Sequence, residues 1–383
     1  MLLNNPPLGV GEAPLASSAL KPRDVVLFGG LPQSAAILAE LERRGHRTAR
    51  LAAADGEEGA RKPTLQGRLV GVLALVSALL ALGRLLRHRR PDALIVSGAG
   101  PVQVLVPVLL ARLTGTPVWL HLPAPQHWPW RRRESRGAAP RAMALAARGE
   151  ARLGRRILSA AAVVSAGSAT AAAALRSFAA CPREVTVLRP PASEPAMTSA
   201  PVGSALSGRR VVLCHGACHG AAAATLLVRV AARLRRSHDD VVLVVAGEDE
   251  GRGQPAEDGV VAVAPAVHAA LTRHAAVHLL LRTGDEGEGG RSAPLGTLLG
   301  SGRPVVAAGE TGWELVREII GAGTIPVRAD AETLAAALDE LLSDAELAGA
   351  LGAEGARRAA IRFSAQGAAD RIEAVLAGSA RHG

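Results

Sequence analysis

The segment RRVVLCHG, Arg209 to Gly216, begins the second of two similar arrangements in the chain. It is a short apolar run that ends in a turn containing glycine, which is typical of a strand buried in a parallel sheet. A helical Ala/Leu pattern, TLLVRVAARLRR, follows, and the next apolar run is DVVLVVAGE, Asp240 to Glu248. Strands that alternate with helices in this way predict an α/β domain with a parallel sheet.

The first half of the chain shows the same alternation. It starts with DVVLFGG, Asp24 to Gly30, a strand that ends in a glycine pair. Further strands are expected in DALIVSG (92–98), PVWLHLP (117–123) and AAVVSAGS (161–168). We therefore expect two Rossmann-like, doubly wound domains. Ligands of such open sheets bind beyond the carboxyl ends of the strands, so we expect these two edges to face each other across a cleft.

Composition shifts suggest the domain boundaries. Residues 189–208, RPPASEPAMTSAPVGSALSG, are rich in Pro, Ser and Ala and predict a linker. Residues 1–23 lack a basic start and a long apolar run, so a flexible tail is expected rather than a signal peptide. The expected domains are residues 24–188 and residues 209–360. The remaining residues, 361–383, are expected to form a helix, with a return to the N-terminal domain as one option.

Charge is distributed unevenly along the 383 residues. Residues 1–200 contain 26 Lys+Arg against 12 Asp+Glu, whereas residues 201–383 contain 18 against 22. A basic half predicts anionic partners such as a membrane surface or a charged substrate. Nucleic acid is not expected, because aromatic residues make up only 2% of the chain and no base-stacking motif is present. Three cysteines are too few for a disulfide framework, which favours a reducing, cytoplasmic location.

Two segments raise the question of membrane contact. LVGVLALVSALLAL, Leu69 to Leu82, is shorter than the roughly 18 to 20 residues that cross a bilayer, so it predicts a buried or surface-docked helix. The basic stretch RLLRHRR after it keeps peripheral contact with an anionic membrane open as an alternative. A loop further on suits either an acceptor phosphate or a membrane interface, and the alternative is a disordered tip. Its candidate residues are Trp128, Trp130, Arg131, Arg132 and Arg133.

Several longer segments resemble one enzyme family. GSGRPVVAAGETGWELVRE (300–318) and RADAETLAAALDELLSDAELAGALG (328–352) are similar to the C-terminal half of a GT-B glycosyltransferase of the family-4 kind. GGLPQSAAILAELERRGHRTARL (29–51) and AAVVSAGSATAAAALRS (161–177) resemble that family's N-terminal domain. The resemblance extends over about residues 24–376. It implies transfer of a sugar from a nucleotide-diphosphate sugar to an acceptor, without a catalytic metal or another cofactor.

The family's donor-binding motifs are degenerate in this chain. Its diphosphate loop carries an Arg and a Lys, and the resemblance places Gly216 on the loop's glycine and Ala217 and Ala222 on the two cations. Its paired glutamates fall on Gly289 and Thr297. If each lost charged contact contributed about 1.5 to 3 kcal/mol, four losses would cost roughly 6 to 12 kcal/mol. Catalysis therefore requires replacement groups.

The stretch CHGACHG, Cys214 to Gly220, is then the altered phosphate loop. One alternative is that His215 or His219 contacts the diphosphate. A metal or redox site is another, although two cysteines three residues apart with no second cluster are a weak zinc pattern. Cys214 can also be a small core residue.

Other residues could supply the missing contacts. Arg282 and Arg291 could replace the cations, because a guanidinium grips phosphate in a bidentate manner. Glu286 or Glu288 could hold the sugar, and Ser292 is a suitable helix N-cap. The full set of candidate donor-binding residues is Gly29, Gly30, His215, Gly216, His219, Gly247, Glu248, Arg282, Glu286, Glu288, Arg291, Ser292 and Thr297. No metal ligand is expected.

His121, in VWLHLP, is the candidate catalytic residue. The resemblance places it where the family has a cleft histidine that contacts the transferred sugar or orients the acceptor. Leu122 follows it where the family often has Asp. The alternative is a core histidine with satisfied hydrogen bonds. Two functions stay open: an active, metal-independent glycosyltransferase, or a pseudo-glycosyltransferase that acts as a binding or scaffold partner or in a non-glycosidic coupling.

Overall fold

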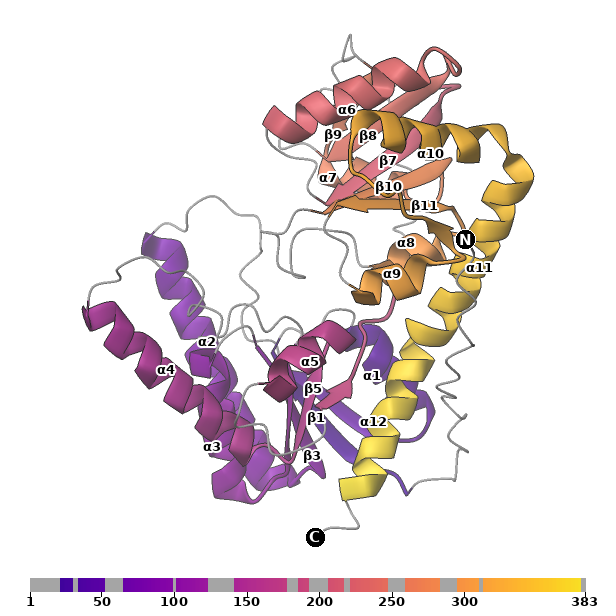
Figure 1. Cartoon of the computed structure of the whole chain (residues 1–383). Helices are drawn as coiled ribbons and strands as arrows, with labels where there is room; N and C mark the ends of the chain where they lie inside the picture. The colour runs from indigo at the N-terminus through magenta and orange to yellow at the C-terminus, as the bar shows by residue number, and fades with distance from the viewer. Residues whose placement is uncertain are drawn as a thin grey trace.

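The computed structural model of the chain contains two parallel β-sheets with helices on both faces (Figure 1). It describes residues 21–29, 34–51, 65–98, 101–122, 141–177, 185–192, 206–216, 221–246, 259–282, 295–309 and 313–379. In this part of the chain each sheet has six strands, and both are wound as expected from the alternating pattern. The sequence expectation of an α/β fold with two Rossmann-like domains is confirmed.

The strand order within each sheet reverses direction once. The N-terminal sheet has the order β2 (Arg47–Leu51), β1 (Asp24–Phe28), β3 (Ala93–Ser97), β4 (Val118–Leu122), β5 (Val163–Ala166), β6 (Val185–Val187). The C-terminal sheet has the order β12 (Gly323–Thr324), β11 (Val305–Gly309), β10 (Val277–Arg282), β7 (Arg210–Gly216), β8 (Val241–Ala246), β9 (Val260–Val263). The reversals lie between β1 and β3 and between β7 and β10. Such switch points are where open sheets bind ligands.

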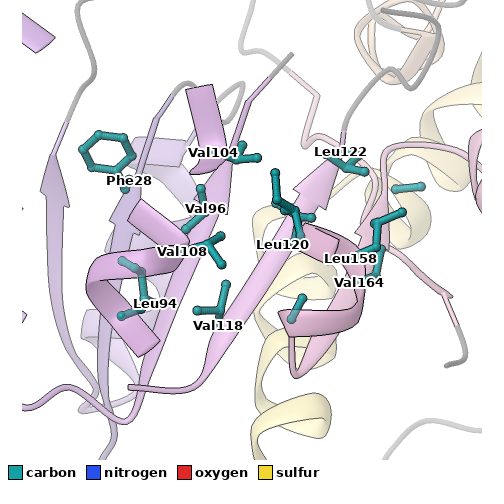
Figure 2. Packing of buried hydrophobic residues seen from close by; sticks show 14 of the residues in the cluster. Phe28, Leu94, Val96, Val104, Val108, Val118, Leu120, Leu122, Leu158 and Val164 are labelled. Carbon is teal, nitrogen blue, oxygen red and sulfur yellow. The ribbon is translucent and has the colours of Figure 1, made fainter. Parts of the chain in front are cut away.

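Helices from both ends of the chain cover the N-terminal sheet. One face packs against α2 (Leu65–Arg89), α3 (Pro101–Thr114), α4 (Arg141–Ala160) and α5 (Ala169–Ser177). Figure 2 shows this core, in which Val104 and Val108 of α3 meet Leu94, Val96 and Leu120 of the strands. The opposite face packs against α1 (Ser34–Arg43) and α12 (Ala365–Ser379).

The C-terminal sheet is covered in the same way. One face packs against α6 (Ala221–Leu234) and α10 (Ala331–Ser343). The other face carries α7 (Pro265–Leu271), α8 (Leu295–Gly300) and α9 (Trp313–Ile319). Helix α11 (Ala345–Arg362) packs beside α8 and leads the chain back toward the N-terminal domain (Figure 1).

Helix α12 completes the core of the N-terminal domain, although more than 150 residues of the C-terminal domain precede it in the chain. Ala369 and Ile372 are buried against the strands. Polar contacts hold the helix in register: Arg44 lies 2.6 Å from Asp370 and 2.8 Å from Glu373, and His46 Nε2 lies 2.8 Å from Glu373 Oε1. Residues 365–379 therefore form the returning helix that the sequence left as an option.

The two chain crossings between the domains lie side by side. The Ala192 N–H donates to the Phe363 carbonyl at 2.6 Å. Beside them the Glu318 carboxylate, with only 2% of its side chain exposed, lies 2.8 Å from Arg362 and 3.5 Å from Arg189. The first residues of the expected linker, 189–192, are therefore packed, while 193–205 lie outside the described residues.

The predicted helix at 69–82 is part of α2, whose Leu82 and Leu86 are buried in the core. None of the helices in the described ranges has the length and apolarity that a membrane span requires. Strands β6 and β12 were not predicted, because three and two residues are too short for a recognisable apolar run. The expected N-terminal tail, 1–23, lies almost entirely outside the described residues.

Candidate functional site

A glycine ends the first strand of each sheet, directly at the switch point. Gly29 has φ +99° and Gly216 has φ +84°, which is the left-handed region that side chains disfavour. A Cβ atom at Gly29 would lie 2.0 Å from the Ser97 carbonyl oxygen on β3. A Cβ at Gly216 would lie 2.1 Å from the Leu281 carbonyl oxygen on β10. Both positions therefore require glycine for two independent reasons, backbone conformation and close approach.

A helix follows each of these glycines in the chain. Helix α1 begins at Ser34 and α6 begins at Ala221, each a few residues beyond its glycine. Free N–H groups and the helix dipole make a helix start after such a turn suitable for an anion. In addition α5, which starts where β5 ends, contacts α9, which starts soon after β11 ends. The carboxyl ends of the two sheets therefore lie on the side where the domains meet.

His121 lies in β4 beside Ser97 of β3 and Ser165 of β5. Only 1% of its surface is exposed, and burial lowers its pKa to about 4. Its Nδ1 lies 2.9 Å from the Ser165 hydroxyl oxygen, which also accepts a hydrogen bond of 2.6 Å from the Trp119 indole N–H. The imidazole is therefore neutral at ordinary pH and fixed in orientation.

The hydrogen-bond count also sets the tautomer of His121. Among the described residues, Ser165 has the two partners Trp119 and His121. An indole nitrogen can only donate, so the serine proton has one acceptor, Nδ1 of His121. The ring proton therefore sits on Nε2, which has no hydrogen-bond partner in the part of the chain that the structure describes. The Nε2 atom of His121 is thus a hydrogen-bond donor rather than an acceptor.

Three histidines cluster inside the C-terminal domain. His215 Nε2 lies 3.1 Å from His278 Nδ1, and the His215 ring contacts the His268 ring with centroids 4.8 Å apart. His278 Nε2 lies 3.0 Å from the Ser301 hydroxyl, and His268 Nε2 lies 2.8 Å from the Cys214 carbonyl oxygen. Burial lowers the pKa of His278 to about 3 and that of His215 well below its ordinary value. His215 and His278 are therefore neutral at ordinary pH.

This cluster bears on the CHGACHG stretch. His215 is 4% exposed, and its Nε2 lies 3.1 Å from His278 Nδ1, so its imidazole already contacts another histidine. Cys214 is a buried thiol, not part of a disulfide, and it packs in the core. No group of three or more His, Cys, Asp or Glu residues in the described ranges is arranged to hold a metal.

The other candidates differ in how far the structure describes them. Arg282 ends β10 with its backbone paired to Gly309 at the end of β11, but its side chain lies outside the described atoms. Thr297 is buried in α8 with 8% exposure. The candidates outside the described residues are Gly30, His219, Gly247, Glu248, Glu286, Glu288, Arg291, Ser292, Trp128, Trp130, Arg131, Arg132 and Arg133.

Sequence reasoning missed Ser165, Trp119, His278 and His268. A lone hydroxyl in the apolar strand AVVSA and a histidine second in the run VHLLLR were weak signals that polar partners exist. Their partners lie 44 and 63 residues away in the chain, so spacing alone could not pair them.

We predict that Gly216→Ala lowers the free energy of unfolding by about 3 kcal/mol, since it adds both backbone strain and a steric overlap. Gly208→Ala is the matched control, because Gly208 has φ +72° but open space around it, and should cost about 1 kcal/mol. Chemical denaturation followed by circular dichroism measures both. Equal losses would contradict the close approach at Leu281.

We predict that the C-terminal domain loses stability as the pH falls below about 6.5. The unfolded state then protonates His278 while the folded state, with its pKa near 3, does not. His278→Gln should reduce this slope by about 1.4 kcal/mol per pH unit between about pH 4 and 6. Denaturation midpoints across this range test it, with His274→Gln at an exposed histidine as control. An unchanged slope in His278→Gln would refute the prediction.

Comparison with known proteins assigns the fold. Residues 29–192 match the family described as "Glycosyl transferase 4-like domain". No curated protein matches the sequence significantly. Three similar solved structures are those of HepE from Anabaena in complex with UDP, a glycosyltransferase from Rickettsia africae, and a Listeria monocytogenes protein described as a UDP-N-acetylglucosamine 2-epimerase.

The three matches span nearly whole chains at low sequence identity. HepE is 13% identical with a TM-score of 0.59, covering 93% of this chain and 100% of its own. The Rickettsia protein is 11% identical with a TM-score of 0.61, covering 95% and 100%. The Listeria protein is 14% identical with a TM-score of 0.57, covering 94% and 98%. The chain therefore has the GT-B fold, and residues 29–192 of it match the glycosyl transferase 4-like family model.

Proposed function

We propose that the chain is a glycosyltransferase that moves a sugar from a nucleotide-diphosphate sugar to an acceptor by a metal-independent route. The match of residues 29–192 to a glycosyltransferase domain supports the reaction class. The solved complexes of HepE with UDP and with UDP-glucose, which share this fold, support the donor class. UDP is accordingly the first nucleotide to test.

The observation that carries the proposal is the obligatory glycine at the β7 switch point. The backbone at Gly216 lies so close to β10 that a Cβ atom there would overlap the Leu281 carbonyl oxygen, and α6 begins five residues later. A strand, a glycine turn and a helix start are the parts that hold a diphosphate in other open sheets. The donor would lie at this edge, with its diphosphate directed to the start of α6.

A departing diphosphate needs positive charge, and the loop itself supplies none. Ala217 and Ala222 stand at the places of the family's cations. We assign that role to Arg282, which ends the strand next to β7, and to Arg291. Amide N–H groups at the helix start would share the charge, as preorganised donors do in other transfer sites. Glu286 or Glu288 would hold sugar hydroxyls.

His121 would act from the N-terminal domain as a hydrogen-bond donor. Its Nε2–H would contact an oxygen of the transferred sugar or of the acceptor. Because its pKa is about 4, the imidazole stays neutral across the physiological range and does not depend on a titration near neutrality. Ser165 is the positioning residue that keeps the proton on Nε2.

We predict that at least one of UDP, GDP and dTDP raises the melting temperature of the protein and binds in calorimetry, with a chelator present. Arg282→Ala and Arg291→Ala should each weaken that affinity about tenfold or more, the effect of losing one charge-assisted hydrogen bond. Arg357→Ala, at an arginine 62% exposed on α11, is the matched control. If no nucleotide binds, the transferase assignment fails and the binding or scaffold function is favoured.

We predict that Ser165→Ala reduces release of nucleoside diphosphate from the bound donor sugar about tenfold, since the His121 proton is no longer held on Nε2. Nucleotide affinity should stay at the wild-type value, because Ser165 does not contact the C-terminal domain. Trp119→Phe is the comparison: it removes the other hydrogen bond of Ser165 and keeps the bond to His121. An equal loss in both variants would point to packing instead of proton placement.

A further inference from the structure

The outer surfaces of α2, α3 and α4 are unusual in what they expose. Large apolar side chains face outward on two of these helices: Leu80 is 60% exposed on α2, and Leu109 and Leu113 are 48% and 84% exposed on α3. Val76 and Val106 are also exposed, at 47% and 40%. Their inner faces already fill the core of the N-terminal domain, so these residues have no role in that core.

The same three helices are strongly basic. Together they contain ten arginines and a single acidic residue, Glu150. Six of the arginines are exposed on the described surface: Arg84 and Arg87 on α2, Arg112 on α3, and Arg152, Arg155 and Arg156 on α4. Within the described part of the chain, none of these six guanidinium groups forms an ion pair. Their charge is therefore available to a partner.

The helices lie next to one another, so these residues form one surface. Helix α3 contacts α2 on one side and α4 on the other. Helices α2 and α3 are in close contact at Gly83 of α2, where an added methyl group would lie 3.9 Å from the Leu110 side chain of α3. Figure 1 shows all three on the side of the sheet away from α12. We call this the α2–α4 surface.

We propose that the α2–α4 surface docks on a lipid bilayer that contains anionic phospholipids. The exposed leucines and valines would enter the boundary between headgroups and acyl chains, and the arginines would contact lipid phosphates. Such a membrane stabilises both kinds of side chain, because it offers apolar acyl chains and negatively charged phosphates together. The docking is peripheral, because no described helix can span the bilayer.

Charge complementarity selects this occupant over a second copy of the chain. A symmetric dimer through the α2–α4 surface would bring the six arginines of one copy against those of the other, and no exposed carboxylate is described there to offset the repulsion. A bilayer presents phosphates at every position along the surface. An acidic protein partner is the remaining alternative, and the experiment separates it.

Co-sedimentation of the full chain with vesicles tests whether the arginines contact lipid phosphates. The vesicles consist of phosphatidylcholine, with and without about 30% phosphatidylglycerol. The protein should bind the anionic vesicles and bind neutral ones far less. Combined reversal of Arg152, Arg155 and Arg156 to Glu should lower affinity at least 100-fold, at about fivefold for each arginine lost. The control reverses three exposed arginines in the other domain: Arg229 and Arg233 on α6, and Arg236 in the turn that follows it.

The outcomes of this test are distinct. Retained binding in the α6 variant with loss in the α4 variant supports the proposal. Equal loss in both means that net charge alone drives binding, which overturns it. Absence of binding to either vesicle type also overturns it and leaves an acidic protein as the partner to seek. Circular dichroism and melting temperature confirm that both triple variants are folded.

The apolar component has its own test. Leu80→Asn, Leu109→Asn and Leu113→Asn together remove exposed apolar surface without touching the core, and should weaken binding to the anionic vesicles at least tenfold. Val327→Asn and Ile361→Asn, at residues 97% and 58% exposed in the C-terminal domain, are the control. Wild-type binding by the triple variant would show that no side chain enters the lipid, which contradicts the proposal.

Discussion

The close approach of two backbones at each switch point is the constraint on which the structure depends. At Gly29 and again at Gly216, the strand that begins a domain ends against a carbonyl group of the adjacent strand, with no room for a side chain. Each glycine adopts a positive φ that side chains disfavour, so no other residue fits the strand end without strain. Both glycines lie at the switch point of their sheet, which is where open sheets bind ligands.

Buried polar groups pair with one another in both domains. Trp119, Ser165 and His121 form hydrogen bonds to one another inside the N-terminal domain, and His215, His278 and Ser301 do so in the C-terminal domain. Unpaired, each of these groups would cost roughly 1 to 3 kcal/mol on burial. Paired, they fix ring orientation and proton position. The two domains differ in one respect: the His121 Nε2–H has no hydrogen-bond partner among the described residues, whereas His215 and His278 contact each other.

The sequence predicted the fold because its signals are local. Runs such as DVVLF and VVLVVA are continuous and apolar, so they identify strands buried on both faces, and the glycine that follows marks the strand end. Gly29, Gly216 and His121 could be singled out for the same reason, since each ends or nearly ends such a run.

Contacts between distant segments were not predictable. No local sequence pattern indicates that His215 contacts His278 or that Ser165 contacts His121. Likewise, no pattern in α12 indicates that Arg44 and His46 are the partners of Glu373. The exposure of individual side chains could not be predicted either. The run at 69–82 is apolar on both faces of the helix, so only the structure shows that Leu82 is buried and Leu80 is exposed. The α2–α4 surface follows from that distinction.

The position of α12 also determines when the N-terminal domain can finish folding. Its sheet is synthesised early, yet one face stays uncovered by Ala368, Ala369, Ile372 and Leu376 until translation has passed through the whole C-terminal domain. Until then, α1 is the one described helix that covers Val25, Leu27 and Ile95 on that face. The part of this apolar face that α12 covers therefore stays exposed while the whole C-terminal domain is synthesised. During this interval it is available to a chaperone that binds apolar surfaces.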